Sequence, residues 1–173
     1  LLSPDDFGLV AMVVVFTAAA SLLAEAGFVQ ALIQKKDTCD EHYHSVFWVN
    51  LIIGCTLGGG FYMLSSQIGA LYMRPEIEGI CKVLAFNFPL IAIIMVPRTL
   101  LTKELILKHQ MLAELSAMII SSIFAILLAV NGFGYWSLVA QRVISTITLA
   151  IILWSISTWR PRFLFVWSRV REL

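Results

Sequence analysis

Apolar residues fall in five long runs that are separated by short polar segments. Each run holds almost no charge and is 20 to 27 residues long. Because about 20 apolar residues in a helix cross the roughly 30 Å hydrocarbon layer of a bilayer, the runs predict five transmembrane helices. We expect them at residues 7–33, 46–71, 77–96, 111–130 and 135–157. The third is the shortest in its apolar core, and we expect it to end at Pro97.

Composition supports this interpretation. The chain is 60% hydrophobic and 13% charged, whereas soluble domains carry about 25% charged residues. The connections between runs are short and none is a low-complexity linker. The predicted fold class is therefore all-α, a polytopic membrane helix bundle without a soluble domain.

The basic residues predict the orientation of the bundle. Alternate connecting segments face the same side of the membrane, and one side then carries nine of the twelve Lys and Arg residues, while the other carries two. The remaining one, Arg142, lies inside the fifth run. Because positive residues concentrate on the cytoplasmic side, we expect the N-terminus outside and the C-terminus in the cytoplasm.

Other classes of function find little support. The basic residues gather at helix ends and not along one face, which favours contact with anionic membrane lipids over nucleic acid. His42 and His44 have no companion ligands at metal-binding spacing, and no phosphate-binding loop or hydrolase motif is present. We therefore expect no metal, no cofactor and no enzymatic activity, and a transporter is the favoured class.

Arg142 is the outstanding polar residue of the predicted spans. It lies seven residues past Tyr135, which places it about 10 Å below the outer end of its helix at 1.5 Å per residue. A charge at the centre of a membrane helix costs about 2.5 to 3.5 kcal/mol on insertion scales. Arg142 and its neighbour Gln141 are thus candidates for a central cavity, and structural hydrogen bonding or snorkelling is the alternative.

Four further residues are candidates. Glu25 lies near the predicted inner end of the first helix, either exposed there or available for ion coupling. Arg98 is either a positive-inside anchor or an anion-binding group at a cavity mouth. Asn50 and Asn87 lie within apolar runs, where an amide either joins two helices by hydrogen bonds or faces a polar substrate.

Several segments resemble one family in the same order along the chain. They are residues 2–12 (LSPDDFGLVAM), 31–36 (ALIQKK), 46–51 (VFWVNL), 96–101 (VPRTLL) and 133–141 (FGYWSLVAQ). Together they span almost the whole chain, and they are similar to polysaccharide biosynthesis proteins, the oligosaccharide flippases of the MOP superfamily.

The resemblance implies a function and a context. The chain would be the N-terminal lobe of a two-lobe transporter of the bacterial inner membrane, and this lobe would lack its first helix. The C-terminal lobe of the same protein would be the partner of this chain. The cargo would be an undecaprenyl-diphosphate-linked oligosaccharide, moved from the cytoplasmic to the periplasmic leaflet for lipopolysaccharide or exopolysaccharide assembly. Arg142 and Arg98 would contact the diphosphate, Gln141, Asn50 and Asn87 the sugars, and Glu25 would couple an ion.

Three alternatives stay open at this point. A multidrug-extrusion-type exporter of small molecules would share the bundle. A membrane-embedded polymerase or glycosyltransferase would need a sizeable outer loop, and the outer segments here are short. A purely structural scaffold would tolerate neutral substitutions at every polar membrane position.

Overall fold

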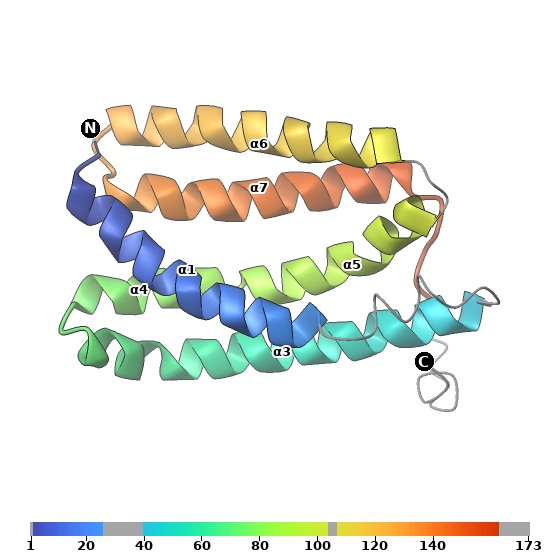
Figure 1. Ribbon diagram of the computed structural model, residues 1–173, viewed down its shortest axis with the longest axis horizontal. Coiled ribbons are helices and arrows are strands. Elements are labelled where there is room, and N and C mark those ends of the chain that lie inside the picture. Colours follow the sequence, from blue (N-terminus) through green and yellow to red (C-terminus); the bar gives the residue numbers. More distant parts are fainter. Residues whose placement is uncertain (1, 26–39, 104–106, 163–173) are drawn as a thin grey trace.

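The chain forms a bundle of long helices lying side by side. A computed structural model describes residues 2–25, 40–103 and 107–162, and within those ranges every regular element is a helix, so the predicted all-α class is confirmed (Figure 1). The helices are α1 (Pro4–Glu25), α3 (Asp40–Leu71), α4 (Pro75–Ala85), α5 (Asn87–Lys103), α6 (Leu107–Val130) and α7 (Tyr135–Ile156).

Four helical stretches of the described residues are long and apolar enough to cross a bilayer. They are His42–Leu71, Pro75–Lys103, Leu107–Val130 and Tyr135–Ile156. These stretches correspond to the second to fifth predicted spans. α3 begins at Asp40, six residues before the predicted start at 46, and α6 begins at Leu107, four residues before the predicted start at 111. The first predicted span is represented by α1, while its residues 26–33 lie outside the described part. The chain is thus a multi-pass membrane protein.

The third predicted span differs from expectation in two places. Phe86 separates α4 from α5, and its N–H bonds in a tight turn to Val83 O at 3.3 Å. The physical cause is Pro89, which has no N–H to offer the carbonyl of Ala85. A Cβ on Gly58 of α3 would lie 2.7 Å from that carbonyl oxygen. Glycine therefore lets α3 approach the interruption closely.

The expected helix end at Pro97 is wrong. α5 continues through Pro97 to Lys103. Pro97 cannot donate to Ile93 O one turn earlier, and the indole Nε1 of Trp154 on α7 donates to this carbonyl instead, at 3.3 Å. A neighbouring helix thus supplies the hydrogen bond that proline removes, which allows the helix to continue.

α6 and α7 form the most closely packed neighbours of the bundle. The buried face of α6 consists of small residues at every fourth position, which are Ala113, Ala117, Ser121, Ala125 and Ala129. Small side chains let two helix backbones approach each other. The opposite face of α6 exposes large apolar side chains, among them Leu115, Ile119, Ile123, Ile126 and Val130, as expected where a helix faces lipid.

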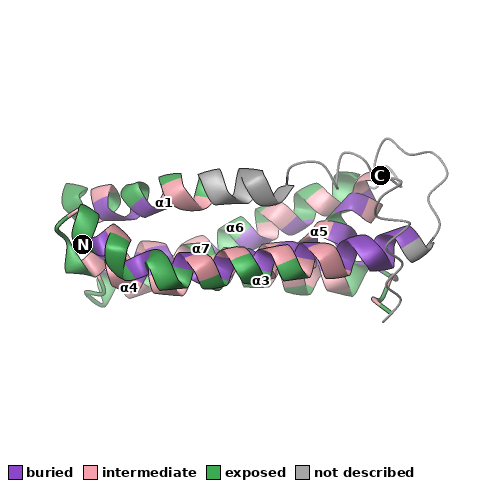
Figure 2. Cartoon of the chain, turned by 90° about the horizontal axis from the view of Figure 1, so that it is seen from below, coloured by how far each residue is buried: buried purple, intermediate pink, exposed green. Residues whose placement is uncertain are grey.

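Buried and exposed residues recur with helical spacing in α1 up to residue 18 and in α3 from residue 42, so these parts of the two helices turn one face inward (Figure 2). Asp6 lies in the first turn of α1, and a Cβ built on Gly134, directly before α7, would be 3.5 Å from its carboxylate. Its carboxylate accepts hydrogen bonds from Ser3 N at 2.7 Å and Ser3 Oγ at 2.9 Å. These bonds, with one from the Tyr135 backbone, lower the pKa of Asp6 below its ordinary value of 3.8. The charged carboxylate therefore stabilises the turn in which α1 begins.

Candidate functional site

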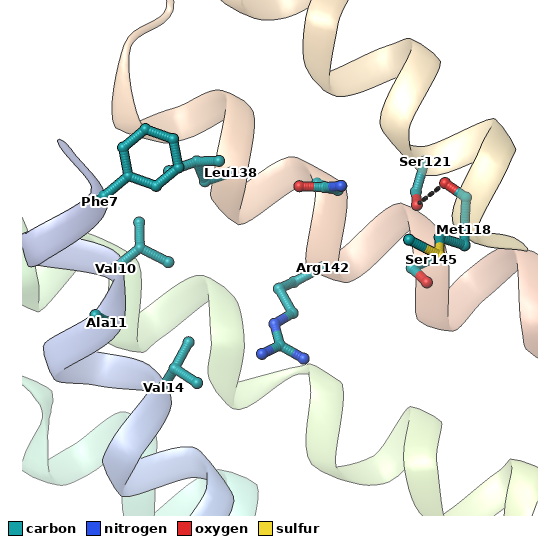
Figure 3. A pocket seen from close by; sticks show the side chains of 10 residues that line it. Phe7, Val10, Ala11, Val14, Met118, Ser121, Leu138, Arg142 and Ser145 are labelled. Carbon is teal, nitrogen blue, oxygen red and sulfur yellow. Dashed lines mark hydrogen bonds between the residues drawn. The ribbon is translucent and has the colours of Figure 1, made fainter. Parts of the chain in front are cut away.

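A cavity of about 450 Å³ lies between α1, α6 and α7. Figure 3 shows it from close by, with the side chains of α1 on one side and those of α6 and α7 on the other. Its lining residues are Phe7, Val10, Ala11 and Val14 of α1, Met118 and Ser121 of α6, and Leu138, Gln141, Arg142 and Ser145 of α7.

Helical periodicity produces the two main walls of the cavity. The α1 residues stand at positions i, i+3, i+4 and i+7, and the α7 residues repeat this spacing from Leu138 to Ser145. Residues at this spacing share one face of a helix. The α1 wall is wholly apolar, whereas the α7 wall carries an amide, a guanidinium and a hydroxyl. The cavity therefore presents hydrocarbon on one side and hydrogen-bonding groups on the other.

The Arg142 guanidinium extends from α7 into the open space across from Val10 and Val14 (Figure 3). Its side chain has no hydrogen bond or ion pair within the parts of the chain that the structure describes. Arg142 belongs to the stretch Tyr135–Ile156, which is long and apolar enough to span a membrane. A guanidinium has five N–H donors and matches the oxygens of a phosphate or carboxylate. The arrangement thus suits an anion entering the cavity.

Gln141 and the serines form the rest of the polar wall. Gln141 Nε2 donates to Ser122 Oγ of α6 at 3.2 Å, and this bond ties α7 to α6 beside the cavity. Ser121 is buried, and its hydroxyl donates to Met118 O within its own helix at 3.1 Å (Figure 3). The structure therefore brings together two of the sequence candidates, Arg142 and Gln141.

Arg98 lies elsewhere and has a protein partner. Its Nη2 is 2.6 Å from Glu114 Oε1 on α6, and the side chains are 50% and 41% exposed. Gln110 Nε2 donates to the same carboxylate oxygen at 3.3 Å, and Thr102 Oγ1 donates to Gln110 Oε1 at 3.0 Å. Arg98 thus belongs to a polar network between α5 and α6, and it does not line the cavity.

The two asparagines also lie outside the cavity lining. Asn50 is 3% exposed, and its Nδ2 donates to the Met95 sulfur at 3.3 Å, which joins α3 to α5. Its Oδ1 and that of Asn87 are buried and have no hydrogen-bond partner. Glu25 is the last residue of α1, and its side chain lies outside the described residues.

Sequence reasoning did not single out Ser121, Ser145 or the α1 wall. The signal was available for α7, because Leu138, Gln141, Arg142 and Ser145 follow one helix face. No such signal identifies which face of α1 or α6 lies opposite. No group of three His, Cys, Asp or Glu side chains suited to a metal is found where the structure describes the chain.

Comparisons with known proteins agree with one another. A family model described as "Polysaccharide biosynthesis protein" matches residues 1–173. A succinoglycan biosynthesis transport protein, ExoT of Rhizobium meliloti, is 30% identical over the whole chain. The teichuronic acid biosynthesis protein TuaB of Bacillus subtilis is 25% identical over 86% of the chain, and the lipopolysaccharide biosynthesis protein WzxC of Escherichia coli is 26% identical over 69%.

The chain spans only part of these relatives. The matched regions cover 35% of the Rhizobium protein, 31% of the Bacillus protein and 24% of the Escherichia protein. No solved structure matches the chain significantly.

Proposed function

The chain belongs to the polysaccharide biosynthesis protein family, and from this membership we propose that it is part of a transporter that flips undecaprenyl-diphosphate-linked oligosaccharides. The relatives are named for succinoglycan transport and for lipopolysaccharide and teichuronic acid biosynthesis. In this proposal the cargo moves from the cytoplasmic to the periplasmic leaflet of a bacterial inner membrane, where polymer assembly continues.

The physical problem is the headgroup of such a lipid. Sugar hydroxyls and a diphosphate lose their hydration in hydrocarbon, where each unpaired polar group costs kcal/mol and each bare charge costs far more. A hydrated cavity between two lobes removes this barrier, and rocking of the lobes gives alternating access. Because the chain spans about a third of its relatives, we propose that it supplies most of the N-terminal lobe and that the C-terminal lobe completes the path.

The observation that carries the proposal is the Arg142 guanidinium in the 450 Å³ cavity. A cation within an apolar span is expensive unless water or an anion compensates it, and no carboxylate of the described residues does so. We propose that Arg142 contacts the diphosphate in bidentate fashion, with Gln141 beside it facing sugar hydroxyls. The apolar α1 wall then accommodates the start of the polyprenyl chain.

The remaining candidates have less direct roles in this proposal. Arg98 would attract the anionic headgroup at a cavity mouth, in exchange with its partner Glu114. Asn50 and Asn87 each have a buried amide oxygen without a partner, which a sugar hydroxyl would satisfy in another conformation. Glu25 would couple transport to an ion.

Deletion and complementation in a polymer-producing host test the proposal. Loss of surface polysaccharide on deletion, with accumulation of the lipid-linked precursor, supports a flippase, whereas intact polymer with new drug sensitivity supports a small-molecule exporter. Wild type, Arg142→Ala and Arg142→Lys are then compared at equal membrane abundance. Arg74→Ala is the matched control because Arg74 is an exposed arginine in the turn between α3 and α4.

We expect Arg142→Ala to abolish polymer production and Arg142→Lys to retain part of it, since lysine keeps the charge without the bidentate geometry. Arg74→Ala should produce normal polymer. Full polymer from the Arg142→Ala variant would remove Arg142 from the site.

A further inference from the structure

The segment that follows α7 is fastened to α3 through the backbone of one residue. Arg162 N donates to His44 Nδ1 at 3.2 Å, and Trp48 Nε1 donates to Arg162 O at 3.0 Å. His44 and Trp48 are four residues apart on α3, so they stand one turn apart on the same face. Both hydrogen-bonding groups of a single residue are therefore held by side chains of a distant helix.

Aromatic contacts reinforce this attachment. Within the exit segment, defined here as residues 157–162, the Trp159 ring stacks on His44 with centroids 5.2 Å apart and planes at 25°. Phe47 meets Trp159 edge-on at 5.7 Å. The Arg160 guanidinium lies 5.6 Å from the centre of the Trp154 ring of α7. His44 is only 5% exposed as a result.

The protonation state of His44 decides whether this contact can exist. A backbone N–H can only donate, so Nδ1 of His44 must carry a lone pair. The imidazolium form carries hydrogens on both ring nitrogens, and its Nδ1–H would face the Arg162 N–H. We propose that His44 and Trp48 form a proton-sensitive clasp, in which neutral His44 holds the exit segment on α3 and protonation of His44 releases it.

The charged groups around the clasp favour release once His44 is charged. They are cationic where the structure describes them: Arg160 and Arg162 in the exit segment, and Lys103 of α5, whose Nζ lies 5.9 Å from the centre of the Tyr43 ring. His42 and Tyr43 are the titratable neighbours on α3, and the last turn of α7 has no basic residue. The side chains of Asp40 and Glu41, in the first turn of α3, lie outside the described residues.

Histidine is the side chain that commonly changes charge between about pH 5 and 8. A change in proton concentration at this end of the bundle therefore changes whether the exit segment is bound to α3 or released from it. This inference concerns the position of the exit segment and does not depend on what the protein transports.

Distance measurements by electron paramagnetic resonance test the clasp in the full-length protein in lipid nanodiscs. One spin label is attached to Cys55, an exposed cysteine of α3, and the other to Thr158→Cys in the exit segment, after Cys39 and Cys81 are replaced by Ser. Distributions are recorded at pH 8 and pH 5. The variants are His44→Gln, whose amide oxygen accepts but does not titrate, and His42→Gln, a matched change at the neighbouring buried histidine.

We expect one narrow distance population for wild type at pH 8 and loss of most of it at pH 5. His42→Gln should behave like wild type, whereas His44→Gln should keep the narrow population at both pH values. Trp48→Phe, which removes the second hydrogen bond, should broaden the distribution at pH 8 and leave its pH response in place. The proposal is overturned if wild type is unchanged between the two pH values, or if His44→Gln responds to pH as wild type does.

Discussion

The indole Nε1 of Trp154 lies 3.3 Å from the carbonyl oxygen of Ile93, the one carbonyl of α5 that Pro97 cannot serve. One tryptophan thus joins α7 to α5 and also allows α5 to continue past a proline. Arg142 also lies on α7, so the hydrogen bond from Trp154 helps to fix the position of the helix that carries Arg142.

Trp154→Phe is expected to lower the free energy of unfolding by about 1 kcal/mol, because it leaves the partly buried carbonyl of Ile93 without its hydrogen-bond partner. Pro97→Ala restores the missing backbone donor, so Trp154→Phe should cost much less in the Pro97→Ala background. Thermal unfolding of the full-length protein in detergent gives this double-mutant cycle. Additive effects would show that the indole hydrogen bond does not compensate for the proline.

Gly58 is expected to be intolerant of a methyl group, while its neighbour Gly59 is not. A Cβ at Gly58 would lie 2.7 Å from Ala85 O, whereas one at Gly59 would meet nothing within 4 Å. Gly58→Ala should therefore destabilise the bundle by about 1–3 kcal/mol, as overpacking does. Gly59→Ala is the matched control, and its melting temperature should equal or exceed that of wild type because alanine favours helix. Equal losses in both variants would contradict the close approach of α3 to α4.

Substitutions in the Arg98–Glu114 pair can distinguish a structural role of Arg98 from a role in transport. Both side chains are at least two-fifths exposed, so solvent screening limits the pair to at most about 1 kcal/mol. Arg98→Ala should hardly change the melting temperature. The exchanged pair, Arg98→Glu with Glu114→Arg, should keep the melting temperature of wild type and still fail to support polymer production, because the proposed phosphate contact needs the cation at position 98. Full recovery of polymer by the exchanged pair would assign Arg98 to the protein contact alone.

The predicted orientation places the turn between α3 and α4 in the periplasm and the exit segment in the cytoplasm. Met73 is 89% exposed in that turn, and Thr158 is exposed after α7. In intact cells, a membrane-impermeant maleimide should label Met73→Cys and should label Thr158→Cys only after permeabilisation. The reverse pattern would contradict the predicted orientation, and labelling of both residues from outside would exclude an odd number of membrane crossings between them.

The sequence predicts the helices well because each must bury about 20 residues in hydrocarbon, and that requirement is visible in apolar runs. It does not predict how a helix tolerates proline, since the compensating donor at Trp154 comes from another helix 57 positions away from Pro97. Two prolines of one apolar run thus have different outcomes, because α5 continues through Pro97 but the helix is interrupted before Pro89. Phe86 itself is apolar, and the cause lies three residues later in Pro89.

The candidate site was predicted in part. Arg142 stands out because a guanidinium in an apolar run is costly unless water or an anion compensates its charge. The residues that share its helix face can be predicted from their spacing along α7. For Arg98 the sequence left two roles open, because its partner Glu114 becomes evident only once α6 is packed against α5. Glycine packing likewise distinguishes Gly58 from Gly59 and Gly60 only once the neighbouring helix is placed.

The most direct test of the central claim is the flipping of a fluorescent undecaprenyl-diphosphate-linked oligosaccharide by the full-length protein in proteoliposomes. Arg142→Ala should reduce the initial rate at least ten-fold, which corresponds to about 1.4 kcal/mol, whereas Arg74→Ala should match wild type. A wild-type rate for Arg142→Ala would show that the guanidinium in the cavity does not serve the anionic cargo.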